Sequence, residues 1–142
     1  MVVTESTARV EIFQSIYTII DSNKLSSTTV LATFPEKSPT FPCYVINPSN
    51  LINDALALDM GSRESDFSMR IILYGDARDG TKKIDEMKDN IIDTLRTTAN
   101  VTSLKADNIS IKEIDDEVSS QSVFKNMKLN KGSLTIRGVL LI

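Results

Sequence analysis

The sequence predicts an α+β fold, in which two helices pack on one face of a mainly antiparallel sheet. Residues 7–22 and 81–98 carry apolar side chains at helical spacing, whereas the other readable segments are short and alternating or β-branched. Several of these strands follow one another without an intervening helix, which favours antiparallel pairing. At 142 residues the chain is expected to form a single domain over 1–142.

The first helix is expected over 7–22, before the polar stretch DSNKLSS breaks the pattern. Thr4 or Ser6 is a suitable N-cap. The apolar residues fall on one broad stripe, formed by Val10, Ile12, Phe13, Ile16, Tyr17, Ile19 and Ile20.

Two strands are expected next, at 28–34 and 41–46. Pro42 has no N–H for a ladder, so the second strand is expected at a sheet edge or beginning at this residue. The segment 47–65 is ambiguous, because ALALDM suits a strand and LINDALAL suits two helical turns. Strand 67–74 is the clearest, and its apolar residues on both faces at one end indicate deeper covering there or a partner.

The second helix, 81–98, is expected to end in the stretch ANVTSLKADN. Ile84, Met87, Ile91, Ile92 and Leu95 form its apolar stripe. Strands are then expected at 109–114 and 133–142, separated by a mostly polar segment over 115–132.

Composition restricts the chemistry. The chain has no histidine and one cysteine, so Ser-His-Asp and Cys-His catalysis and zinc sites built on Cys and His are excluded as they stand. A net charge of −3 gives no reason to expect a general nucleic-acid binder. No stretch approaches the length of a membrane span, and the start lacks the pattern of a signal peptide, so synthesis in the cytoplasm and no membrane partner are expected.

One stretch, YGDARDGTKK, imitates a phosphate-binding loop. Gly75 and Gly80 are correctly spaced, but Thr81 stands at the lysine position and Lys83 at the magnesium-binding Ser/Thr position. Asp76 and Asp79 also place negative charge in the phosphate cradle. The stretch is therefore interpreted as a strand-to-helix connection in which Gly75 lets the chain turn and Asp79 or Thr81 caps the helix.

No catalytic constellation is found, and no cofactor or metal is expected. The consecutive carboxylates Asp115, Asp116 and Glu117 splay apart and are interpreted as a solvated loop. Cys43 is interpreted as a buried structural thiol.

The positive signal is a pair of long segments, 47–66 and 115–132, that carry apolar residues without clear secondary structure. Such loops are uncommon in small domains and are usually functional, so they indicate an interaction protein. The expected interaction residues are Leu51, Ile52, Leu56, Leu58, Met60, Asp115, Asp116, Glu117, Val123, Phe124, Met127 and Leu129.

The order of elements resembles that of the tail terminator (tail completion) proteins of long-tailed bacteriophages. The matching stretches are TARVEIFQSIYTIID, FPCYVI, MRIILYGDARDGTKKIDEMKDNIIDTLRT and GSLTIRGVLLI. The resemblance implies a non-enzymatic virion protein of the tail or neck. It would form a homo-oligomeric, hexameric ring that caps the tail tube, joins the head connector and lets DNA pass without specific binding.

Two alternatives stay open at the level of sequence. One is another neck or head–tail connector protein. The other is a small-ligand regulatory α+β domain, which needs a concave pocket with converging polar groups.

Overall fold

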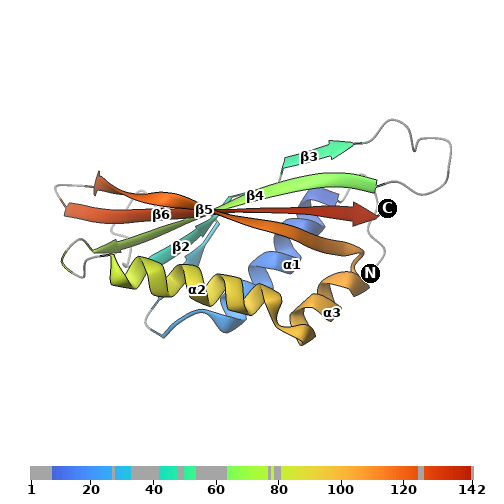
Figure 1. Cartoon of the computed structure of the whole chain (residues 1–142), viewed down its shortest axis with the longest axis horizontal. Coiled ribbons are helices and arrows are strands. Elements are labelled where there is room, and N and C mark those ends of the chain that lie inside the picture. Colours follow the sequence, from blue (N-terminus) through green and yellow to red (C-terminus); the bar gives the residue numbers. More distant parts are fainter. Residues whose placement is uncertain are drawn as a thin grey trace.

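A computed structural model describes residues 8–26, 28–32, 42–47, 50–53, 64–76, 78, 81–124 and 127–141. Within these residues, three helices lie on one side of a six-stranded sheet (Figure 1). The predicted α+β class, with helices on one face of a mostly antiparallel sheet, is confirmed. The structure adds a helix that the sequence pattern did not predict.

The sheet is built around two long strands, β4 (Glu64–Asp76) and β6 (Met127–Leu141), which pair antiparallel along their lengths. β5 (Ile109–Phe124) pairs with the other side of β6. The free side of β4 carries β3 (Asn50–Asn53) near its start and β2 (Cys43–Ile46) further along. β1 (Thr29–Leu31) pairs with β2 in parallel.

Helix α1 (Ala8–Asn23) matches the first predicted helix, but its buried stripe is narrower than expected. Ile12, Ile16 and Ile20 are buried at intervals of four residues. Val10, expected on the same stripe, is 59% exposed, because it lies two residues before the buried Ile12 and so points to the opposite side of the helix. The proposed caps Thr4 and Ser6 lie outside the described residues.

Helix α2 (Lys82–Arg96) buries the predicted residues Ile84, Met87, Ile91 and Leu95. They join the helix-facing side chains of β4 in one core, formed there by Phe67, Met69, Ile71 and Leu73. Complete burial of each such side chain contributes about 1.5–3 kcal/mol. This core fixes the helices against the sheet.

The stretch predicted only to close the second helix forms a third, α3 (Thr98–Ala106). Thr97 has ψ 133°, which interrupts the helical path, and the chain then turns helical again. Asn108, with φ 64°, redirects the chain into β5. The sequence did not predict this helix because α3 buries one residue, Leu104, and one buried position cannot show a helical period.

The prediction that 115–132 lacks secondary structure is wrong, because 115–124 lies in β5 and 127–132 lies in β6. Backbone hydrogen bonds to the neighbouring strand hold these polar residues extended, and such bonds form whether or not the side chains alternate between apolar and polar. The helical alternative for LINDALAL is also wrong at its start, since Leu51–Asn53 are in β3. The strand alternative, ALALDM, lies outside the described residues.

The remaining boundaries differ in detail. β1 and β2 are shorter than expected. β2 begins directly after Pro42, which agrees with the expectation that the strand starts at this residue. β4 continues to Asp76, so Gly75 lies inside the strand and does not end it. None of the helices in the described part of the chain is long and apolar enough to span a bilayer.

Candidate interaction surface

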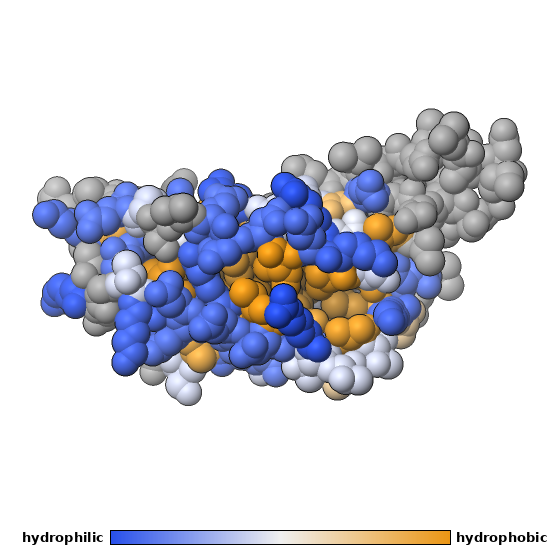
Figure 2. Space-filling view, in the orientation of Figure 1, coloured by the Kyte–Doolittle hydropathy of each residue, from blue (hydrophilic) through white to orange (hydrophobic). Residues whose placement is uncertain are grey.

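In the described part of the molecule, a hollow lies between β5 and the helices α2 and α3. It has a volume of about 570 Å³ and is called here the β5 groove. Figure 2 shows hydrophobic atoms gathered in this hollow, between a hydrophilic band above and the helical side below. An apolar concavity on an otherwise polar face indicates an interaction site.

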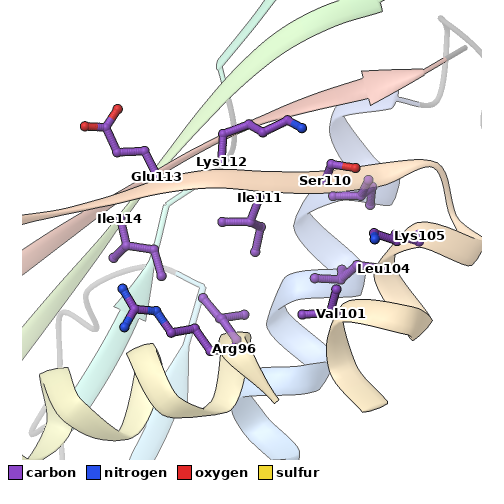
Figure 3. Close-up of a pocket in the computed structure, with 11 residues that line it drawn as sticks. Arg96, Val101, Leu104, Lys105, Ser110, Ile111, Lys112, Glu113 and Ile114 are labelled. Atoms are coloured by element: carbon purple, nitrogen blue, oxygen red, sulfur yellow. The ribbon is translucent and has the colours of Figure 1, made fainter. Parts of the chain in front are cut away.

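The floor of the β5 groove comes from the strand and from α3. Ile111 and Ile114 point from β5 toward the helices, and Val101 and Leu104 face them from α3 (Figure 3). Leu104 is buried, whereas the other three are only partly covered. Three aliphatic side chains therefore offer apolar surface to a partner.

The rim of the β5 groove is basic. Arg96 and Lys105 stand on the helical side, and Lys112 projects from β5 on the other side of the strand (Figure 3). The carboxylate among the lining residues, Glu113, lies 3.8 Å from Arg137 across the strand pair. The charge around the groove therefore favours an acidic occupant.

The outer side of β5 is an open sheet edge. Among the described residues, β5 pairs with β6 and with no other strand. Two irregularities interrupt the pairing, between Ile111 and Glu113 and between Glu117 and Ser120, and they leave a regular stretch over 113–117. An open edge of this length presents unpaired N–H and C=O groups that another strand can use.

No family model and no curated protein matches the chain. Its fold is similar to that of a solved structure described as the virion of a native gene transfer agent (GTA) particle. The TM-score is 0.62 at 10% identity, and the match covers 95% of this chain and 98% of that chain. At this identity the likeness concerns the fold, and it spans nearly the whole of both chains.

The three consecutive carboxylates were expected in a solvated loop, but they lie in β5. Each forms an ion pair with a lysine or arginine side chain. Asp115 lies 2.8 Å from Arg137, and Glu117 lies 3.2 Å from Arg70 on the face away from the helices. Asp116 points to the helical side, where its Oδ1 lies 2.7 Å from Nζ of Lys88. The expected splaying is confirmed, since successive residues of a strand face opposite sides.

Glu117 is the centre of a polar network on the open face. Ser133 Oγ donates to one carboxylate oxygen at 2.7 Å, and Thr135 Oγ1 donates to the other at 3.1 Å. These hydrogen bonds, with a smaller contribution from Arg70, hold the pKa of Glu117 below its ordinary value. The network ties three adjacent strands together and leaves this carboxylate charged.

The apolar residues predicted for the interaction surface are placed only in part. Leu129, one of the expected interaction residues, is fully buried within the subunit and packs in its interior. Leu51 and Ile52 lie in β3, and Val123, Phe124 and Met127 lie in strands at the tip of the β5–β6 hairpin. Leu56, Leu58 and Met60 lie outside the described residues.

In the stretch that imitates a phosphate-binding loop, Asp76 forms an ion pair with Arg78. The side chain of Arg78 binds the carboxylate of Asp76, with Nη2 2.6 Å from Oδ2, and this holds the pKa of Asp76 below its ordinary value. Of the two expected caps of α2, Thr81 stands at the N-cap position but makes no side-chain capping hydrogen bond, and Asp79 lies outside the described residues. No group of three potential metal ligands occurs among the described residues.

Cys43 is buried, as predicted, and burial raises its thiol pKa to about 11. Cys43 and the buried Val45 pair with Tyr74 and Ile72, which are themselves half-buried, so this end of β4 is partly covered on the face away from the helices. Deeper covering was one of the two expectations for this end of the strand.

Sequence reasoning missed the β5 groove. Its polar and apolar members are split between β5, which was predicted over 109–114, and α3, which was not predicted. The available signal was the basic content of this region, with Arg96, Lys105 and Lys112 close in sequence.

Proposed function

We propose that this chain is a non-enzymatic structural protein of a phage-like virion. In that role it is a tail terminator, whose copies form a hexameric ring that caps the tail tube and joins it to the head connector. DNA passes through the ring without specific binding, which agrees with a net charge of −3 and no basic excess.

The observation that carries the proposal is the two-way coverage of the fold match. A chain from a virion particle and this chain correspond over 98% and 95% of their lengths, so neither needs a large additional unit to account for the likeness. The order of elements in the sequence resembles that of tail terminators, and this resemblance does not depend on the fold match. Together they favour a virion role over that of an isolated cellular domain.

The chemistry of the described residues also favours a structural role. The clustered carboxylates of β5 are engaged by Lys88, Arg70 and Arg137, which leaves them poorly placed for acid–base catalysis. The absence of histidine in the sequence removes the usual general base. An open strand edge and an apolar groove are instead features of a subunit that associates with other subunits.

Native mass spectrometry of the purified chain, alone and with tail tubes, tests the proposal. A closed six-copy species that blocks further tube growth supports a terminator. A ring that binds portal-side components but leaves tube growth unchanged indicates another neck or head–tail connector protein.

The volume of the β5 groove is compatible with one alternative function, that of a small-ligand regulatory domain. Pockets of about 300–1,000 Å³ hold ligands of drug size. A thermal-shift screen with nucleotides and amino acids tests this. A ligand at a hundredfold excess over its Kd stabilises the fold by about 2.7 kcal/mol, and such a shift in a monomeric chain would favour the alternative.

A further inference from the structure

We propose that the β5 groove binds residues 54–60 of a neighbouring copy, which lie along the outer edge of β5 as an added strand. This inference rests on the proposed ring, and it names the two surfaces that meet between adjacent subunits. Residues 54–60 are called here the acidic segment.

The groove sets three requirements for its occupant. The open edge of β5 offers backbone hydrogen bonds to an extended chain. The aliphatic floor at Val101, Ile111 and Ile114 requires apolar side chains. The basic rim requires negative charge.

The acidic segment, DALALDM, meets all three. Leu56, Leu58 and Met60 alternate, so in an extended conformation they project to one side. Asp54 and Asp59 supply two negative charges, and the segment contains no lysine or arginine. When extended, the segment projects Asp54 to the same side as its apolar residues and Asp59 to the other side. Its apolar side can therefore cover the groove floor with Asp54 near Lys105 on the helical side, while Asp59 meets Lys112 on the opposite side of β5.

The sheet places the groove and β3, from which the acidic segment continues in the chain, on opposite sides of the β4–β6 pair. Near the start of β4, a row of paired residues crosses four strands from Leu51 in β3 through Phe67 and Gly138 to Ile111 in β5. The acidic segment follows β3 directly in the chain, whereas the groove adjoins β5 at the other end of this row. Contacts between opposite edges of identical subunits are head-to-tail, and such contacts form a ring when the rotation between subunits closes.

A second acidic surface fits the groove less well. Glu86, Asp89 and Asp93 line a shallow hollow on α2 with Leu25. This surface has charge complementary to the groove but only one apolar residue among its lining. It would leave the apolar floor of the β5 groove uncovered, so the acidic segment is the better occupant.

Charge reversal with rescue tests the pairing directly. Lys105→Glu with Lys112→Glu places negative charge at both rims, and both residues are exposed, so folding should be unchanged. We expect the concentration for half-assembly to rise at least about tenfold. Adding Asp54→Lys and Asp59→Lys should restore assembly to near the wild-type concentration.

The matched control is Lys82→Glu with Lys128→Glu, which changes net charge equally at exposed positions outside the groove. It should assemble like the wild type in sedimentation velocity. The inference is overturned if the groove variant assembles at the same concentration as the wild type. It is also overturned if the aspartate reversals fail to rescue a variant that has lost assembly. Neither result contradicts the ring itself.

A peptide measurement keeps the inference testable if the chain does not form rings. A fluorescent peptide spanning residues 50–62 is titrated with a Leu56→Asp/Leu58→Asp variant, whose own acidic segment is disabled. We expect the anisotropy to rise with this variant. The rise should be lost when Lys105→Glu and Lys112→Glu are added to this variant. If the peptide does not bind the variant that keeps both lysines, the inference is contradicted. A monomeric wild type that nevertheless binds the peptide contradicts the proposed ring alone.

Discussion

Nζ of Lys88 lies 2.7 Å from Oδ1 of Asp116, and the lysine side chain is 8% exposed while that of the aspartate is 61% exposed. The same ammonium donates to the carbonyl oxygen of Glu117 at 3.0 Å. Helix α2 is thereby joined to the middle of β5, in the segment that sequence reasoning expected to be a loop. The pair fixes the long hairpin relative to the helices that form the other wall of the β5 groove.

Asp116→Asn should destabilise the fold by about 1–2 kcal/mol. The change removes the negative charge 2.7 Å from a buried ammonium, although the exposure of the aspartate reduces the loss relative to a fully buried pair. Lys88→Met should cost less, because methionine keeps the packed stem and removes the desolvated charge. Urea denaturation measures both, and a larger loss for Lys88→Met would contradict the assignment of the ion pair.

Gly138→Ala should be among the more damaging small changes in the sheet. A Cβ there would stand 2.3 Å from the backbone oxygen of Ser110 and 2.7 Å from Cζ of Phe67. Since backbone cannot move aside cheaply, we expect a loss of about 1–3 kcal/mol or more. Gly75→Ala is the matched control, because its new Cβ meets Ile84 at an ordinary 3.4 Å. Equal thermal melting of the two variants would refute the close approach at Gly138.

Cys43 should be unreactive in the folded protein. The thiol is buried and its pKa is raised to about 11, so at pH 8 very little thiolate is present and access is blocked. Ellman's reagent should therefore react at the rate of unfolding in buffer and rapidly in denaturant. Rapid labelling of the folded chain would contradict the buried position of β2.

The Glu117 network should make stability sensitive to acid. Its folded pKa lies below the ordinary 4.5, so the carboxylate stabilises the fold at pH values above 4.5 and loses this contribution as the pH falls through the folded pKa. The stability difference between wild type and Glu117→Gln should be constant above about pH 5 and shrink below pH 4.5. Urea denaturation across pH 3–7 checks this, and a difference independent of pH would argue against the network.

The helical and central-strand core was predictable because its side chains repeat with the period of the element. The spacing of Ile84, Met87 and Ile91 predicts helix α2. The alternation of Phe67, Met69 and Ile71 predicts strand β4. Packing against one shared core is what imposes those periods on the sequence.

The hairpin and the groove were not predictable in the same way. Residues 115–124 are held by hydrogen bonds to β6 and by partners such as Lys88 and Arg70, which lie far away in sequence. Helix α3 buries Leu104 alone and leaves Val101 in the groove, so it has little periodic signal. The candidate interaction surface therefore emerges from pairing between distant segments.

The ring is the central claim, and native mass spectrometry of the full chain over a wide concentration range tests it most directly. The proposed function predicts a discrete six-copy species, present alone or on addition of tail tubes, without open-ended polymers. A chain that remains strictly monomeric at high concentration, both alone and with tail tubes, would contradict it.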